Sequence, residues 1–112
     1  WNLYKDYYTG ENYAHCLEQK VLLETDNDNR IHSKVEAKNT RTEIIEIVLK
    51  SLEATEPEEL KWKFATLSNC YLAIEDVDNA KEFEGKFISQ NPLEWEIDTF
   101  EKSKQEIINL KK

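Results

Sequence analysis

Residues 60–92 have the sequence LKWKFATLSNCYLAIEDVDNAKEFEGKFISQNP, and this stretch decides the fold class. Apolar and aromatic residues recur at helical spacing on both sides of Glu75 and Asp76, which predicts two helices joined by a tight turn. Small residues at Ser68 and Ala80 let two helices approach to about 8–10 Å, while aromatic side chains fill the space beside them. The stretch therefore predicts an antiparallel helical hairpin.

The spacing within this hairpin resembles one tetratricopeptide unit. The positions that match the repeat pattern are Phe64, Leu67, Ser68, Tyr71, Ala80 and Pro92. Glu84 stands where the pattern has an aromatic residue, and Phe87 stands where it has a second alanine. The resemblance implies an all-α fold of tetratricopeptide-like antiparallel helical hairpins stacked right-handed, with wider packing at the far end of this unit.

Composition agrees with a small helical protein. A chain of 112 residues with a 39% apolar share suits a single domain, residues 1–112, with a thin layered core. Only two glycines and two prolines are present, so long helices are favoured over short strands. Outside the hairpin, helical periodicity predicts helices at about residues 11–24, 29–54 and 92–111, which makes about five in all. Because Trp1 is not a methionine, we expect the chain to be a piece of a longer protein.

Capping residues predict where these helices begin. Thr9 is the expected N-cap of the first helix. Thr55 and Glu58 have the spacing of a capping box, with Pro57 in the first helical turn. Asn91, Pro92 and Glu94 repeat the start signal before the last helix.

Residues 26–29, Asp-Asn-Asp-Asn, form the clearest polar turn. Alternating oxygen-bearing side chains also begin an EF-hand calcium loop, but that loop next needs an oxygen ligand and a glycine. Arg30 and Ile31 stand in those places. We therefore predict a solvated turn that caps the following helix.

Apolar stripes predict which faces are buried. Two stripes on residues 60–74 indicate a helix sandwiched between neighbours. Gly85, inside the second helix of the hairpin, predicts close approach by the next helix. The aromatic N-terminus, residues 1–8, is expected to pack on the first hairpin or to continue a helix from upstream. The buried stripes expected on the longest helix, the second hairpin helix and the last helix are Ile31, Val35, Ile45, Val48, Leu49 and Leu52; Val77, Ala80, Phe83 and Phe87; and Leu93, Ile97, Phe100, Ile107 and Leu110.

Residues with the chemistry of catalysis or metal binding are sparse. Cys16 and Cys70 have apolar neighbours in predicted helices, which favours buried free thiols over a disulfide. His15 and His32 are the only histidines, and no spacing of histidines and cysteines supports zinc. No glycine-rich loop is present to hold phosphate. The sequence predicts no cofactor and no catalytic centre.

The net charge of the chain limits the classes of partner that are expected. A formal charge of −8 repels nucleic acid and anionic membrane surfaces, so a partner steered by electrostatics should be basic. No apolar run approaches the roughly 20 residues that span a bilayer, and the N-terminus lacks a secretory signal pattern. The expected compartment is the cytoplasm.

Several short motifs, taken in order, resemble the tetratricopeptide-like TRAFs-binding domain, a family that includes the regulatory region of the apoptosis signal-regulating kinases and many bacterial proteins. Those residues are Tyr8 to Ala14, Trp62, Ala65 to Leu67, Asp76 to Ala80, Trp95, Thr99, Gln105 and Ile108. The chain would correspond to the later part of that domain. The resemblance implies regulatory protein binding in a signalling protein and supplies no catalytic residue.

The first helix of each stacked hairpin lines the concave groove of a tetratricopeptide array, which points to Trp62, Ala65, Asn69 and Leu72 as partner-binding residues. Asn69 stands where peptide-clamping members of the class hold an asparagine that grips the peptide backbone. Ala65 stands where those members use a lysine for a carboxylate. The competing interpretation is that Trp62 and Leu72 are buried against neighbouring helices.

Three functions follow as hypotheses. The first is a protein-protein interaction module that scaffolds a larger cytoplasmic signalling protein and binds a peptide or partner domain. The second is structural self-association, as a homodimer through an apolar end face. The third is a small helical enzyme that uses His15 or His32 with nearby carboxylates, and clustering of both histidines in a deep pocket would favour it.

Overall fold

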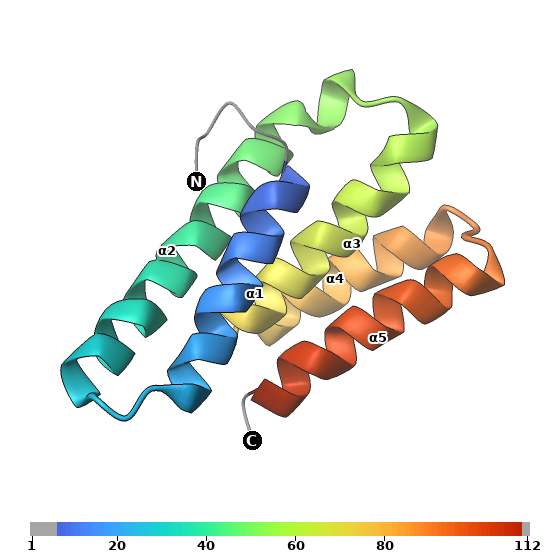
Figure 1. Cartoon of the computed structure of the whole chain (residues 1–112). Coiled ribbons are helices and arrows are strands. Elements are labelled where there is room, and N and C mark those ends of the chain that lie inside the picture. Colours follow the sequence, from blue (N-terminus) through green and yellow to red (C-terminus); the bar gives the residue numbers. More distant parts are fainter. Residues whose placement is uncertain (1–6, 111–112) are drawn as a thin grey trace.

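A computed structural model describes residues 7–110 of the chain, and over this range it is an all-α protein (Figure 1). Its elements are α1 (Tyr7–Leu23), α2 (Asn27–Ser51), a 3₁₀ turn η1 (Leu52–Ala54), α3 (Pro57–Ala73), α4 (Val77–Ser89) and α5 (Glu94–Leu110). The prediction of five helices is confirmed. The expectations for residues 1–6, and for an end of the last helix at Lys111, lie outside the described residues.

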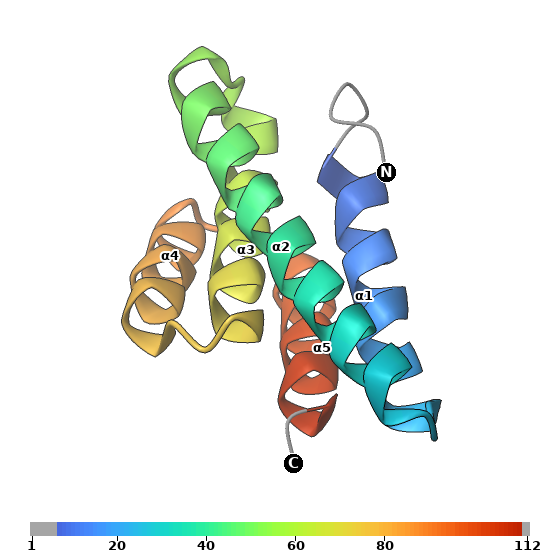
Figure 2. The same ribbon diagram turned by 90° about the vertical axis from the view of Figure 1, so that its left-hand side faces the viewer.

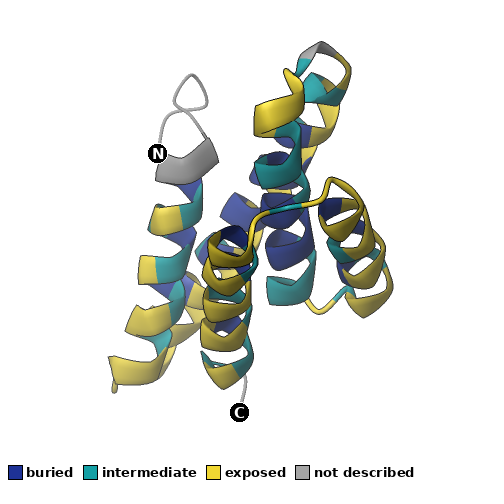
Figure 3. Cartoon of the chain, turned by 90° about the vertical axis from the view of Figure 1, so that its right-hand side faces the viewer, coloured by how far each residue is buried: buried dark blue, intermediate teal, exposed yellow. Residues whose placement is uncertain are grey.

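The helices form two hairpins and a closing helix. α1 packs along α2, α3 packs along α4, and α5 lies against α3 and touches α1. Figure 2 shows α4 and α1 on opposite sides of the molecule, with α2 and α3 between them. The outer faces of the N-terminal and C-terminal helices are exposed (Figure 3). Within residues 7–110, no helix is long and apolar enough to cross a bilayer.

Two of the predicted helix starts are confirmed at the side-chain level. Asp26 caps α2, since its carboxylate accepts from the backbone N–H groups of Asp28 at 2.9 Å and Asn29 at 3.4 Å. Asp76 caps α4 by accepting from the N–H of Asn79 at 3.3 Å. These contacts satisfy N–H groups that have no partner inside their helices.

Two other predicted caps are wrong. α1 begins at Tyr7, so Thr9 lies inside the helix and does not cap it. At α3 the N-cap is Glu56, without a side-chain hydrogen bond, although Pro57 does occupy the first turn as predicted. The Thr55 hydroxyl instead donates to the Ser51 carbonyl at 2.6 Å and accepts from Lys63 Nζ at 2.6 Å. Lys63 thereby links α3 to the end of α2. The Thr55 hydroxyl makes these contacts in place of the predicted capping box.

α3 is the central helix. Every residue from 65 to 70 is buried, so the helix has neighbours on all sides at this level. This confirms the prediction of a sandwiched helix. Leu67 and Cys70 are fully buried in a core that also contains residues of α2 and α4, namely Ile44, Ile45, Val48 and Phe83.

The α3–α4 contact has the small residues and aromatics that the sequence predicts. Ser68 Oγ donates to the Ala80 carbonyl at 2.8 Å, which requires the two backbones to approach closely. Beside this contact the Tyr71 and Phe83 rings stack with centroids 5.6 Å apart. The close approach predicted at Gly85 is wrong, because a Cβ placed there would meet nothing within 4 Å.

The buried face of α2 differs from the predicted stripe. Ile31 and Val35 are each 53% exposed, and Leu49 is 40% exposed. Ile45 and Val48 are buried as predicted, and the full set of buried positions is Ser33, Ala37, Thr40, Arg41, Ile44, Ile45 and Val48. They recur every three or four residues, but the first four are small or polar, so apolar periodicity alone misses them. Small side chains let α1 lie close to this half of α2.

Other burial predictions are confirmed in part. Phe100 and Ile107 are the buried core residues of α5, whereas Leu93 is 59% exposed. Val77 at the start of α4 is also exposed, because it lies in the turn beyond the α3–α4 contact. Cys70 is buried as expected, but Cys16 is exposed on the outer side of α1, and both thiols are free.

Candidate functional site

A pocket of about 230 Å³ opens between the first helices of the hairpins and the last helix. Its walls come from α1, α3 and α5, and Arg41 of α2 contributes to its lining. The lining residues are Glu11, Asn12, His15, Arg41, Trp62, Ala65, Thr66, Asn69, Thr99, Phe100, Ser103, Glu106 and Ile107. The pocket therefore combines one apolar wall with an acidic and hydroxyl-bearing rim.

Three of the four predicted partner-binding residues meet in this pocket. Trp62, Ala65 and Asn69 lie on one face of α3 and all line it. Leu72, one turn further along, is half-buried and does not belong to the lining. The spacing of residues on α3 was sufficient to group the first three, because they follow one face of a regular helix.

Trp62 also takes part in packing. Its ring centroid lies 6.2 Å from that of Phe87 and 6.2 Å from that of Trp95, and the side chain is half-buried. The indole thus packs against α4 and α5, and the residue also lines the pocket, while its role in partner binding stays a prediction.

Asn69 has an unusual environment. The residue is 4% exposed, and its Oδ1 is a buried side-chain atom that has no hydrogen-bond partner within the described part of the chain. Leaving such an acceptor unpaired costs about 1–3 kcal/mol. The χ2 torsion of asparagine is broad and roughly two-fold, so the amide is able to present either its oxygen or its NH₂ group to the pocket.

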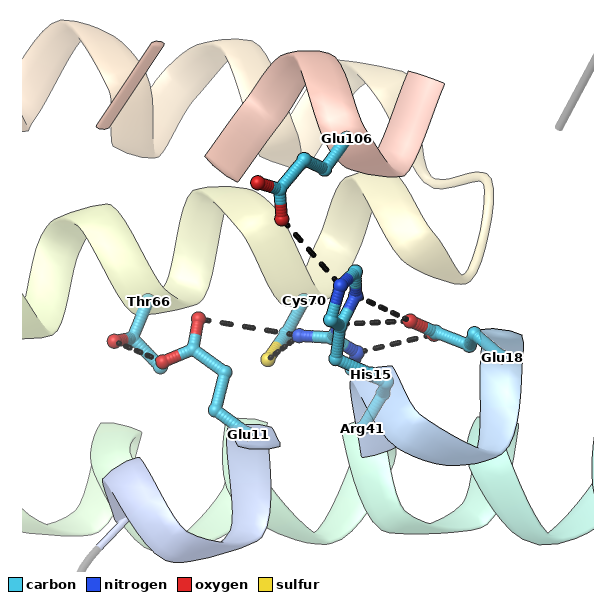
Figure 4. Close-up of polar contacts among 7 residues, drawn as sticks. All are labelled: Glu11, His15, Glu18, Arg41, Thr66, Cys70 and Glu106. Carbon is cyan, nitrogen blue, oxygen red and sulfur yellow. Dashed lines mark hydrogen bonds and ion pairs between the residues drawn. The ribbon is translucent and has the colours of Figure 1, made fainter. Parts of the chain in front are cut away.

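Beneath the pocket lies a buried ionic network around Arg41 (Figure 4). Arg41 is 1% exposed, and it donates from Nε and Nη2 to the two oxygens of Glu18 at 3.1 and 2.8 Å. Its Nη1 lies 3.9 Å from Glu11 Oε1 and 3.6 Å from Cys70 Sγ. The Thr66 hydroxyl donates to the other oxygen of Glu11 at 3.2 Å. Three helices are thereby joined through one guanidinium.

The network shifts the acidity of its members. Burial raises the pKa of Glu11, and the positive charge of Arg41 only partly opposes that effect. Burial also raises the pKa of Cys70 to about 12, so this thiol stays protonated and unreactive at neutral pH. Desolvation alone would lower the pKa of Arg41, but Cys70, Glu18 and Glu11 raise it above its ordinary value. Arg41 is therefore a permanent cation.

His15 connects α1 to α5. Its Nε2 lies 3.4 Å from Glu106 Oε2, and its Nδ1 lies 4.0 Å from Glu18 Oε1. His32, by contrast, is exposed at the surface of α2. Its side chain is 79% exposed and contacts Glu36 on the same helix. His32 does not line the pocket that contains His15, so the clustering of both histidines that would favour an enzyme is not seen. Over residues 7–110 no group of His, Cys, Asp and Glu is arranged to hold a metal ion.

The sequence interpretation missed the polar half of this site. Glu11, His15 and Glu18 lie on one face of α1, at spacings of four and three residues, and that regularity was available in the sequence. Arg41 continues the stripe of Ser33, Ala37, Ile44 and Val48, which is a signal for a buried cation. Glu106 had no local signal, because only the packing of α5 brings it to His15.

A second, wider groove of about 550 Å³ lies near the α1–α2 turn. Its lining mixes apolar residues from four helices with charged ones. Leu22 and Val35 are more than half exposed there, and Leu23 and Ile31 nearby are 83% and 53% exposed. Four of the nine exposed large hydrophobic residues in the described part of the chain lie at this end of the first hairpin.

Comparisons with known proteins give no relative: no family model, no curated protein and no solved structure matches the chain.

Proposed function

We propose that this chain is a protein-interaction module that binds an extended segment of a partner protein in the pocket between α1, α3 and α5. The observation that carries the proposal is the unpaired Oδ1 of Asn69, a residue that is 4% exposed and lines the pocket. A peptide backbone offers both N–H donors and C=O acceptors, which suits a side-chain amide that is free to present either group.

The position of the pocket supports the same function. The walls come from α1, α3 and α5, which would be the first helices of successive units if the hairpins form a tetratricopeptide-like array. A groove on that side of stacked hairpins is a common site for peptide recognition. In this proposal the chain serves as a regulatory scaffold within a larger cytoplasmic signalling protein, as the resemblance to the TRAFs-binding domain implies.

The test is a peptide-display selection on the whole chain, followed by fluorescence anisotropy with the selected peptides. Asn69→Ala should weaken binding about tenfold, since a hydrogen bond to a desolvated amide is worth about 1 kcal/mol or more. The matched control is Asn39→Ala, an exposed asparagine on α2 that should leave affinity unchanged. Circular dichroism confirms that each variant is folded. Equal affinity for Asn69→Ala and the unmodified chain would remove this pocket as the binding site.

Self-association is the second candidate, because Leu22, Leu23, Ile31 and Val35 expose apolar surface at one end of the first hairpin. Light scattering over a concentration series separates the two functions. A monomer at all concentrations supports peptide binding in the pocket. A dimer that dissociates on Leu23→Lys would give self-association priority.

A further inference from the structure

We infer that the pocket between α1, α3 and α5 receives a positively charged side chain, the ammonium of a lysine or the guanidinium of an arginine, from the bound partner segment. The inference rests on the proposed function and names the chemistry of the residue that enters the pocket. Its basis is an excess of acceptors over donors in this part of the molecule.

The balance of charge around the pocket is negative. Two carboxylates of the pocket lining, those of Glu11 and Glu106, and that of Glu18, which is outside the lining, face one guanidinium, that of Arg41, and one imidazole, that of His15. Figure 4 shows these groups converging from α1, α2 and α5. Because the whole chain also carries a net charge of −8, its long-range field attracts the same kind of ligand.

The cation already present does not neutralise all three carboxylates. Arg41 makes its two hydrogen bonds to a carboxylate with Glu18, at 2.8 and 3.1 Å, and stays 3.9 Å from Glu11. The hydrogen-bond donor to Glu11 among the described side chains is the Thr66 hydroxyl, at 3.2 Å from Oε2, and Glu11 Oε1 has no donor within hydrogen-bond distance there. Glu106 is 48% exposed, and among the described residues its ion-pair contact is to the His15 imidazole, at 3.4 Å. Two pocket carboxylates are thus open to a further cation.

A second observation, independent of charge, points to a donor ligand. Asn69 is nine-tenths buried or more, and its Oδ1 accepts no hydrogen bond. Several nearby donors are directed elsewhere: the Thr66 hydroxyl to Glu11, the Thr99 hydroxyl to the Trp95 carbonyl, and Arg41 to Glu18 and Cys70. A ligand with N–H groups would donate hydrogen bonds both to Asn69 Oδ1 and to the pocket carboxylates.

The size and the wall of the pocket fit one side chain. A volume of about 230 Å³ is below the roughly 300–1,000 Å³ typical of small-molecule sites, so it suits a single long residue better than a metabolite. Trp62 supplies an aromatic surface, and a cation near an indole face gains about 0.5–2 kcal/mol. Ala65, Phe100 and Ile107 give an apolar floor for the methylene stem.

The experiment records ¹⁵N–¹H correlation spectra of the whole chain during titration with acetyl-Gly-Lys-Gly-amide and with its uncharged norleucine analogue. The Trp62 indole signal is assigned with Trp62→Phe and the Asn69 amide signal with Asn69→Asp. The lysine peptide should shift both signals and saturate, while the norleucine peptide should not. Glu106→Gln should weaken the lysine peptide roughly fivefold. Glu101→Gln is the matched control, because it makes the same charge change at an exposed position of α5 outside the pocket.

Further titrations distinguish a failure of this inference from a failure of the proposed function. Binding of n-butylammonium as tight as the lysine peptide would keep the cation site and remove the need for a peptide backbone. An arginine peptide that binds as well as lysine, or better, also supports the site and decides which cation fills it. Equal shifts by the lysine and norleucine peptides would overturn the cation site and leave peptide binding standing. The same loss of affinity in Glu101→Gln and Glu106→Gln would overturn it too, since only net charge would then matter.

Discussion

The two sides of α3 are held by different physics. Toward α4 and the start of α5, the contacts are aromatic and apolar, with Phe87 fully buried and its ring 4.9 Å from that of Phe100. Toward α1, the contacts are ionic and polar, centred on Arg41, which is 1% exposed. The stabilisation from apolar contacts is roughly proportional to the buried area and does not depend on direction. The stabilisation from buried ionic contacts depends on every charge having a partner.

This difference separates an apolar half from the half that contains the proposed binding site. Apolar packing leaves no polar group that needs a ligand, so the α3–α4 side serves as a scaffold. The α1 side keeps carboxylates, an imidazole and an unpaired amide around a pocket, at some expense in stability. Functional sites commonly contain titratable groups whose pKa values are shifted by burial and by neighbouring charges.

The largest effect should follow from Phe87→Ala on the scaffold side. Removing a fully buried phenyl ring next to Phe100 and Trp62 should lower the free energy of unfolding by about 4 kcal/mol, because it loses apolar burial and leaves a cavity. Urea denaturation monitored by circular dichroism measures the change. Ile88→Ala is the matched control, since Ile88 is the next residue in α4 and is 47% exposed, and it should cost less than about 1 kcal/mol.

A smaller but still large effect is expected for Arg41→Met on the binding side. The substitution leaves Glu18 and Glu11 beside each other without their cation, and breaking a buried ion pair in this way costs about 3 kcal/mol. Arg30→Met is the control, because Arg30 is exposed at the start of α2, and it should change stability by less than about 1 kcal/mol.

The double variant Arg41→Met with Glu18→Leu sharpens this prediction. Replacing Arg41 and its hydrogen-bonded partner Glu18 by apolar groups should recover part of the lost stability, because only Glu11 is then left without its cation. If Arg41→Met alone costs no more than Arg30→Met, the ionic network does not hold α1 to α2, and the contrast between the two sides of α3 fails.

The smallest effect concerns Glu11 and pH. Its pKa is raised above the ordinary 4.5, so the folded state holds this proton more tightly than the unfolded chain does. The resulting stabilisation is full below pH 4.5 and is lost as pH rises through the folded pKa. The free energy of unfolding of the unmodified chain should therefore fall, relative to Glu11→Gln, between about pH 4 and neutral pH, as measured by urea denaturation at a series of pH values.

Glu96 provides the opposite sign within the same experiment. Lys61 Nζ lies 2.6 Å from its Oε2, and the Leu93 N–H donates to its Oε1 at 2.8 Å, and these two contacts lower the pKa of Glu96. Its stabilisation is present above pH 4.5 and is lost on acidification. Parallel pH profiles for Glu11→Gln and Glu96→Gln would contradict the assignment of the two carboxyls to opposite environments.

Sequence patterns located the apolar half well and the polar half poorly. The α3–α4 hairpin, its turn at Glu75 and Asp76 and its contact at Ser68 and Ala80 all followed from spacing. The burial of Ser33 and Arg41 did not, because a pattern search counts polar residues as surface. Trp62, Ala65 and Asn69 were grouped correctly by helix geometry, but their acidic surroundings were not foreseen.

The sequence by itself determined the helices, their order and most of their ends, because periodicity, caps and breakers act over a few residues. It also determined the apolar core of the second hairpin, where neighbours in space are neighbours along the chain. Only the tertiary structure decided that Glu11, Arg41 and Glu106, from three separate helices, meet at one pocket beside Asn69. Electrostatic pairing depends on distances between segments that no local pattern encodes, so the chemistry of the pocket became visible only when the helices were packed.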